Sequence, residues 1–217
     1  MLDQIEYKIS DKPVPYEEAL GFMEARVADI IAGQAGPCIW FLEHPPLYTA
    51  GTSAKPEGLI DKDKFPVYMT GRGGEYTYHG PGQLVAYVMA DLKQLFAPNP
   101  PDLKAYIARL EAWIITTLAE FGINAFIKEG MIGVWVENDQ GKHEKIAAIG
   151  VRVKKWVAFH GICLNVQPNL DDYQGIVPCG INEFGVTSLE KLGKQVTMAE
   201  VREVMRDKSR WMVDGGR

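Results

Sequence analysis

The first half of the chain contains one long amphipathic segment and several short apolar runs. Apolar residues recur at steps of three and four after two prolines, which predicts a helix that ends near Gly33. The recurring positions are Tyr16, Leu20, Met23, Val27 and Ile30. Short apolar runs that stop at proline or glycine predict strands over Cys38–Leu42, Val67–Met69 and 84–89. The polar stretch 53–66 predicts a surface loop with one short turn of helix.

The second half begins with another amphipathic helix and then changes to a strand pattern. Asp102 is a predicted N-cap and Gly122 a predicted end for this helix. Its expected apolar stripe is Leu103, Ile107, Leu110, Ile114 and Leu118. From Ala125 onward the apolar residues alternate, which predicts strands over Met131–Glu137, 144–153 and 156–166. Because a turn signal at 138–141 joins the first two, we expect an antiparallel meander.

Two Thr-x-x-Glu capping boxes follow the meander. Thr187 is predicted to begin a short helix and Thr197 a longer terminal helix. We find no repeat and no linker, so residues 1–217 are expected to form a single catalytic domain with its core at about 15–205. Strands with helices before, between and after them predict an α+β fold, a mixed and mainly antiparallel sheet flanked by helices.

The bulk composition narrows the class of protein. With a net charge of -5 and no basic stripe, the chain is not expected to bind nucleic acid. Three cysteines without close pairs or metal-type spacing indicate a reducing compartment and free thiols. The N-terminal sequence has no apolar run, so no secretory signal is expected, and no stretch approaches the roughly 20 apolar residues of a membrane span. We therefore expect a cytoplasmic protein; separately from composition, we expect a monomer that uses neither metal nor cofactor.

One of the cysteines has an unusual setting. Cys179 lies in the sequence GIVPCGI, between a proline that fixes the backbone and a glycine that frees it. Such a bend presents the thiol outward and suits a nucleophile, although a simple turn that contains cysteine has the same pattern. Cys38 and Cys163 lie among apolar strand residues instead, where burial raises the pKa of a thiol and leaves it inert.

The richest polar segment lies between two predicted strands. The sequence 71–83, GRGGEYTYHGPGQ, has five glycines with Arg72 and His79 among them. Glycines let a ligand approach the backbone, and the two side chains would supply donors beside it. The spacing fits neither a phosphate-loop nor a dinucleotide fingerprint. Ligand binding is the favoured interpretation, and a long turn connection is the alternative.

The remaining candidates are ambiguous when each is taken by itself. Lys145 begins a strand, where a lysine is ordinarily exposed. His160 precedes Cys163 by three positions, and this odd step predicts that the two side chains lie on opposite faces of a strand. His44 and His143 are expected in loops without a special role. Neither CxxC nor HExxH occurs, so zinc is not expected.

Four segments together resemble a known family in both sequence and order. They are RGGEYTYHGPGQ, KIAAIGVRV, HGICLNV and PCGI, and they are similar to the lipoyl(octanoyl) transferase family over roughly residues 15–205. That family belongs to the superfamily of lipoate and biotin protein ligases, which implies a mixed sheet flanked by helices. The resemblance implies transfer of an octanoyl group from acyl carrier protein to one lysine of a lipoyl domain. The implied acceptors are the E2 subunits of 2-oxoacid dehydrogenases and the glycine cleavage H protein.

The resemblance also assigns roles to residues. It implies that Cys179 is the acyl-thioester nucleophile and that Lys145 activates it. It implies a binding site for acyl chain and thioester lined by Arg72, Gly73, Gly74, Glu75, Tyr76, Thr77, Tyr78, His79, Ala148, Ile149, Gly150, His160, Gly161, Ile162 and Cys163. The family commonly has alanine where this chain has Cys163, which would place that thiol near a bound acyl chain.

Three other functions fit parts of the same pattern. An ATP-dependent lipoate or biotin ligase would have a similar fold and glycine-rich segment but no need of Cys179. A cysteine hydrolase would pair Cys179 with His79 or His160 and use water as the acceptor. A binding module on the same scaffold would need no nucleophile at all.

Overall fold

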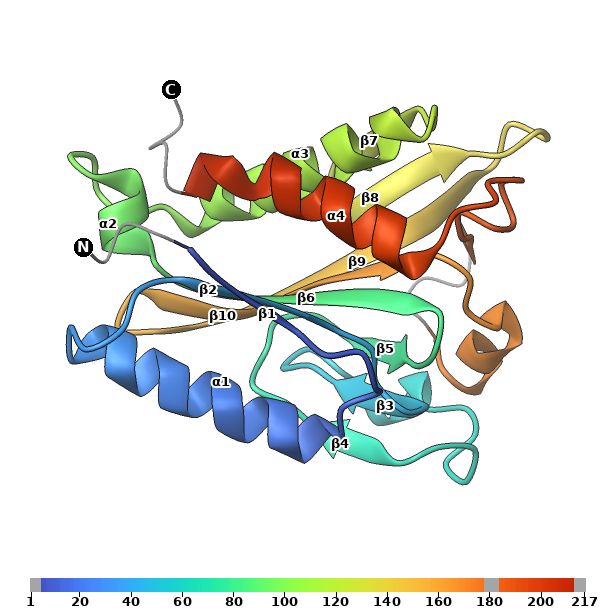
Figure 1. Cartoon of the computed structure of the whole chain (residues 1–217). Helices are drawn as coiled ribbons and strands as arrows, with labels where there is room; N and C mark the ends of the chain where they lie inside the picture. Colours follow the sequence, from blue (N-terminus) through green and yellow to red (C-terminus); the bar gives the residue numbers. More distant parts are fainter. Residues whose placement is uncertain (1–4, 178–183, 213–217) are drawn as a thin grey trace.

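One large twisted sheet with helices on both faces organises the chain (Figure 1). The structure is a computed structural model and describes residues 5–177 and 184–212. The strands of this sheet are β1 (Glu6–Ile9), β2 (Cys38–Leu42), β6 (Gln83–Asp91), β7 (Ala125–Lys128), β8 (Met131–Glu137), β9 (His143–Lys154), β10 (Val157–Asn165) and β11 (Gly185–Val186). Their order is β1-β2-β6-β10-β9-β8-β7, and β11 pairs with β9. Since only the β1–β2 and β9–β11 pairs are parallel in this sheet as described, the predicted mixed, mainly antiparallel sheet is confirmed.

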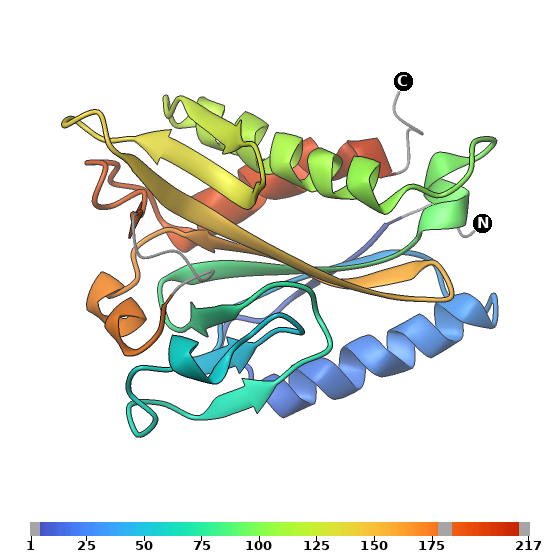
Figure 2. The same ribbon diagram turned by 180° about the vertical axis from the view of Figure 1, so that it is seen from behind.

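A smaller sheet stands beside the large one, on the same side as the first helix (Figure 2). Its strands are β3 (Leu47–Ala50), β4 (Val67–Met69) and β5 (Tyr76–His79), in the order β4-β3-β5. The 3-10 turn η1 (Pro56–Gly58) lies between β3 and β4 in the sequence, and a second 3-10 turn, η2 (Leu170–Gly175), contacts β5. The ring of Tyr78 packs edge to face with those of Tyr48 and Tyr173 in this unit, so the small sheet has its own aromatic core.

Helices cover the two faces of the large sheet. Helix α1 (Tyr16–Ile31) packs on one face, while α2 (Leu92–Phe96), α3 (Leu103–Glu120), α4 (Met198–Lys208) and the turn η4 (Ser209–Met212) lie on the other. Trp113 of α3 and Trp40 of β2 are fully buried in the two separate cores. Burying such side chains contributes a few kcal/mol each, so the sheet is stabilised from both sides. Among the described residues, none of these helices is long and apolar enough to cross a bilayer.

The predicted helices and strands are largely present, with two informative differences. Helix α1 and strand β8 match their predicted ranges, and Asp102 caps α3 by accepting from the Ala105 N–H. The buried face of α3 includes Tyr106 and Trp113, whereas Leu103 from the predicted stripe is 39% exposed. Leu110, Ile114 and Leu118 of the predicted stripe are fully buried, so the predicted face is confirmed except at the first turn of the helix.

The second difference concerns the capping boxes. The box at Thr197 is present, with reciprocal bonds to Glu200. The helix predicted at Thr187 is wrong, because the chain there forms only a turn, in which Ser188 Oγ accepts from the Lys191 N–H at 3.1 Å. Within the described part of the chain, the buried Thr187 hydroxyl has no hydrogen-bond partner, so its side chain does not act as a cap.

Gly161 is required where β10 approaches β6. Its φ is +157°, and a Cβ at this position would lie 2.3 Å from the carbonyl oxygen of Ala86. That contact is far inside van der Waals range, and the obstructing atom is backbone. Gly21 on α1 is the opposite case, since a Cβ there would meet nothing within 4 Å.

These two glycines give a matched pair of substitutions. Gly161→Ala is expected to lower the free energy of unfolding by about 2–3 kcal/mol, because strands β6 and β10 must separate to admit the methyl group. Gly21→Ala is expected to raise it by about 0.5–1 kcal/mol, because alanine is the better helix former. Urea unfolding of both variants measures the two changes, and equal effects at the two positions would contradict the assignment.

Candidate active site

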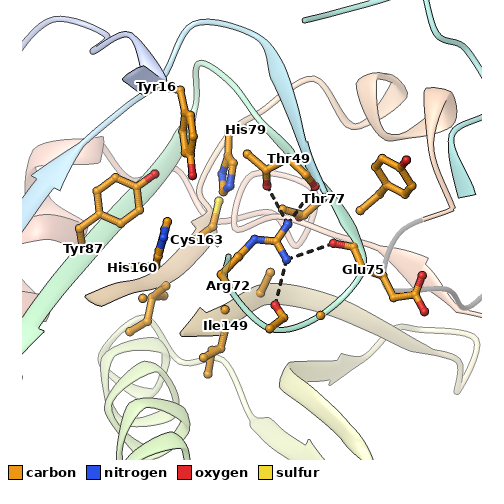
Figure 3. A pocket seen from close by; sticks show the side chains of 17 residues that line it. Tyr16, Thr49, Arg72, Glu75, Thr77, His79, Tyr87, Ile149, His160 and Cys163 are labelled. Atoms are coloured by element: carbon orange, nitrogen blue, oxygen red, sulfur yellow. Dashed lines mark hydrogen bonds between the residues drawn. The ribbon is translucent and has the colours of Figure 1, made fainter. Parts of the chain in front are cut away.

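A cavity lies between the β9–β10 surface, the glycine-rich segment and the start of α1 (Figure 3). The space free of atoms here, counted together with its open mouth, is about 530 Å³. Its walls include every residue predicted to bind substrate except Tyr78. The Tyr78 hydroxyl donates to Asp172 at 2.9 Å within the aromatic core of the small sheet. Sequence reasoning missed three further wall residues, Tyr16, Thr49 and Tyr87.

Arg72 folds the glycine-rich segment onto itself. Its Nη1 donates to the carbonyls of Gly73 and Glu75, both at 3.0 Å. Its Nη2 donates to the carbonyl and the hydroxyl of Thr49 at 2.9 and 2.7 Å. We expected Arg72 to offer donors to a ligand, but these four bonds are made to the protein. The buried guanidinium therefore sets the shape of the cavity wall.

The same segment lies directly on the backbone of β9. The Gly73 N–H donates to the Val151 carbonyl at 3.0 Å. Gly150 pairs with Gly161 across β9 and β10, so the floor of the cavity is bare of side chains at this point. A Cβ on Gly150 would come within 2.6 Å of the Arg72 side chain. Two paired glycines therefore make room for Arg72 above the sheet.

Three histidines gather at one end of the cavity with two tyrosines. Figure 3 shows Tyr16, Tyr87, His79 and His160 on one side of Arg72, with Glu75 on the other. The His44 ring stands 5.7 Å from both the His79 and Tyr87 rings, and Tyr87 is 5.9 Å from His160. We expected His44 to be an ordinary loop residue, and this expectation is wrong, because its side chain is fully buried. A loop position gives no periodic signal that could have revealed its burial.

Two hydrogen bonds fix the tautomer of His44. Its Nδ1 lies 2.6 Å from the Val14 carbonyl oxygen, which can only accept, so Nδ1 bears the proton. The Tyr87 hydroxyl then donates to Nε2 at 2.7 Å. The ring therefore connects the segment that precedes α1, at Val14, with the centre of strand β6, at Tyr87.

Burial keeps the histidine cluster uncharged. Loss of hydration lowers the pKa of His44 to about 4 and that of His160 to about 3. Burial also lowers the pKa of His79 well below its ordinary value, with smaller contributions from neighbouring His44 and Arg72. Within the described residues, Tyr16 Oη, His79 Nδ1 and His160 Nε2 are buried without a hydrogen-bond partner, and no group of three acidic, histidine or cysteine side chains is placed to hold a metal ion.

His160 reaches the cavity because its backbone leaves the normal strand conformation. Its φ is +62°, although the pairing of β10 with β9 continues in register through this position. The ring consequently stacks on that of the adjacent Phe159, at 5.1 Å, and lines the same cavity as Cys163. The predicted placement of His160 and Cys163 on opposite faces is therefore wrong.

The two described cysteines are buried, as the sequence predicts. Cys38 and Cys163 both belong to the core under α1. Burial raises the pKa of Cys38 to about 11 and raises that of Cys163 still further. Both thiols are therefore protonated near neutral pH, and neither is an activated nucleophile.

Lys145 is buried, contrary to the exposure expected of a lysine at the start of a strand. It is 7% exposed, and its Nζ donates to the Ile132 carbonyl at 3.0 Å and lies 4.8 Å from the centre of the Trp135 ring. The pairing of β8 with β9 steps from Val134–Ala147 to Trp135–Lys145, which marks a β-bulge. The bulge turns Lys145 away from the α3 side, where its neighbour Ala147 is packed.

Cys179 lies outside the described residues, but the chain that follows it is tied to Lys145. Val186 pairs with Lys145 in the β9–β11 ladder, and the Thr187 N–H donates to the Lys145 carbonyl at 3.0 Å. The Phe184 ring packs on Trp135 at 5.4 Å. The residues that come five to eight positions after the predicted nucleophile therefore contact the predicted lysine or its immediate neighbour.

The uncharged histidines predict a loss of stability in acid. Unfolded histidine has a pKa near 6.5, so the unfolded state takes up protons first as the pH falls below that value, and the folded state is disfavoured. Each buried histidine should remove about 1 kcal/mol between about pH 7.5 and about pH 5.5. His44→Gln, which retains a donor and an acceptor, should reduce this pH dependence in urea unfolding. The half-exposed His143→Gln is the control, and an equal reduction in both variants would contradict the assignment.

Comparison with known proteins finds relatives over most of the chain. The sequence model described as "Lipoyl protein ligase A/B catalytic domain" matches residues 15–210. The chain is 57% identical to the octanoyltransferase of Parvibaculum lavamentivorans, covering 92% of this chain and 88% of that protein. It is 56% identical to the octanoyltransferase of Paramagnetospirillum magneticum, covering 91% of each.

Solved structures show the same fold at low identity. A bipartite lipoate protein ligase from Thermoplasma acidophilum is 16% identical, with a TM-score of 0.73 over 97% of this chain and 85% of that one. A lipoate-protein ligase A bound with ATP is also 16% identical, with a TM-score of 0.70 over 96% of this chain and 86% of that one. With the family match over most of its length, the chain belongs to the lipoyl protein ligase A/B catalytic-domain family.

Proposed function

We propose a two-step mechanism for the octanoyltransferase activity that this chain shares with its curated relatives. In the first step the Cys179 thiolate attacks the thioester carbonyl of octanoyl acyl carrier protein. A bond forms between Cys179 sulfur and the acyl carbon, the bond to the carrier sulfur breaks, and the carrier thiol leaves with a proton from Lys145. In the second step a neutral lysine amine of a lipoyl domain attacks, an amide forms, and Cys179 leaves as thiolate while Lys145 takes the proton.

The single observation that supports this mechanism best is the placement of Lys145. A lysine is seldom buried without a specific partner, and this one is held beside β11, which follows Cys179 by only a few residues. A thiol with an ordinary pKa near 8.5 is only a few per cent ionised at neutral pH, and a nearby ammonium favours the thiolate. Acyl exchange from thioester to amine needs no ATP, since the amide is the more stable product.

The cavity suits the acyl chain. Ala148 and Cys163, which pair across β9 and β10, lie on its floor, and the histidine and tyrosine cluster bounds it farther along β9 from Lys145. Burial at about 0.8 kcal/mol per CH₂ would give an octanoyl chain roughly 5 kcal/mol of binding free energy. One CH₂ more or less changes this binding free energy only slightly. The far end of the cavity must therefore supply the discrimination against longer chains.

The proposed substrates follow from the resemblance to the lipoyl(octanoyl) transferase family. The donor is octanoyl acyl carrier protein, and the acceptors are lipoyl domains of 2-oxoacid dehydrogenase E2 subunits and the glycine cleavage H protein. The relatives named octanoyltransferase support the acyl group, whereas the ligases of similar fold support only the scaffold.

The direct test is the intact mass of the protein after mixing with octanoyl acyl carrier protein without ATP. We expect an adduct of one octanoyl group, loss of that adduct in Cys179→Ser, and its transfer to an added lipoyl domain. Cys163→Ala is the control and should still form the adduct, because its thiol is buried and protonated.

Two results would contradict the proposal. Use of free octanoate with ATP, and not of the acyl carrier thioester, would indicate a ligase. Release of free octanoate with no amide formed on the lipoyl domain would indicate a hydrolase.

A further inference from the structure

Helix α3 has a buried carboxylate that faces the sheet. Glu111 is 9% exposed and lies among the packed residues of the helix, next to Leu110 and near Ile114. Carboxylates are rarely this buried unless they have a partner. Glu111 Oε1 accepts a hydrogen bond from the Gly133 N–H on β8 at 3.2 Å. The partner is therefore a backbone group of the strand that borders Lys145.

The peptide that Glu111 contacts is the same peptide that holds Lys145. The Gly133 N–H and the Ile132 carbonyl belong to one planar peptide unit. The carbonyl of this unit accepts from Lys145 Nζ at 3.0 Å, while its N–H donates to Glu111. The carboxylate, the peptide and the ammonium thus form a continuous chain of two hydrogen bonds, in which each bond polarises the next.

A local irregularity makes this peptide available. The pairing of β7 with β8 steps from Ile127–Val134 to Lys128–Met131, so Ile132 and Gly133 have no partner on β7. Gly133 has a φ of +126°, and a Cβ there would lie 2.7 Å from the Ala147 carbonyl oxygen and 3.3 Å from Lys145 Nζ. Only glycine brings the peptide this close to the lysine, and the bulge frees both of its polar groups.

We propose that Glu111 is a positioning residue for the reaction, which acts through the Ile132–Gly133 peptide to hold the Lys145 amine in place beside the nucleophile. This inference rests on the proposed role of Lys145 beside Cys179. Glu111 touches neither substrate nor nucleophile. Its negative charge strengthens the carbonyl as an acceptor, and the strengthened carbonyl holds the charged amine in a site that water reaches poorly.

The test separates the effect of the negative charge at position 111 from the effect of the hydrogen bond that this side chain accepts. Glu111→Gln keeps an oxygen that can accept from Gly133 but loses the charge, and Glu120→Gln at the exposed end of α3 is the matched control. The readout is the rate at which iodoacetamide alkylates Cys179 at neutral pH, because the thiolate is the reactive form. Peptide mass analysis separates Cys179 from the two buried cysteines.

The proposal predicts that E111Q lowers the alkylation rate and the single-turnover acylation rate by about tenfold, the scale of one charge-assisted bond. The melting temperature should change little, and E120Q should react at the wild-type rate. Lys145→Met is measured alongside and should slow alkylation at least as much as E111Q.

Different results would overturn different claims. A wild-type alkylation rate in E111Q, together with a slow K145M, would remove the role of Glu111 and leave the proposed function standing. A wild-type rate in K145M would overturn the proposed mechanism and this inference with it. A carboxylate with a merely structural role would lower the melting temperature of E111Q and leave its rate unchanged.

A second variant covers the case in which E111Q does not fold. Glu111→Asp keeps the charge, so it should retain at least about half of the wild-type alkylation rate. A rate in E111D as low as that of K145M would overturn the inference.

Discussion

The close packing of the glycine-rich segment on the backbone of β9 is the contact on which the site depends. Gly73 donates to the Val151 carbonyl, and Arg72 lies over the position where Gly150 has no side chain. Any larger residue at position 150 would push Arg72 away, and the four hydrogen bonds that Arg72 makes to the segment and to Thr49 would be lost together. The cavity thus forms because the sheet has no side chain at Gly150, beneath Arg72.

Burial then divides the site into two electrostatic environments. At one end the histidines are dehydrated and neutral, so this part of the cavity can receive an apolar chain without a charge to desolvate. Beyond the cavity wall Lys145 is buried as well, where its amine donates to the Ile132 carbonyl and lies over the Trp135 ring. The same lack of water is what the proposed acyl binding in one place and the proposed cysteine activation in the other require.

Much of this arrangement could be predicted from the sequence, because periodicity and ordered motifs report on regular structure. The ranges of α1 and β8, the cap at Asp102 and the mixed sheet follow from apolar spacing and capping chemistry. Fourteen of the fifteen residues predicted to bind substrate line one cavity, since two of the motifs pair across β9 and β10 and the glycine-rich motif packs on β9.

The features that could not be predicted all depend on departures from regular geometry. A positive φ turns His160 onto the face of Cys163, and a bulge buries Lys145. His44 is drawn into the core by contacts with residues far away in sequence. The hydrogen bonds that connect Glu111 to Lys145 pass through the Ile132–Gly133 peptide, which the strand pattern predicts to pair regularly with a neighbouring strand. In each case tertiary contacts override a local rule, and only coordinates reveal it.

The central claim is that the Lys145 ammonium stands within contact range of the Cys179 thiolate, at the mouth of a cavity that holds the acyl chain. A crystal structure of the octanoylated protein tests this most directly. The account predicts a Cys179 sulfur within about 4–6 Å of Lys145 Nζ, with the chain extending along the Gly150–Gly161 floor toward His160. A sulfur well beyond that range, or an acyl chain bound elsewhere on the protein, would contradict it.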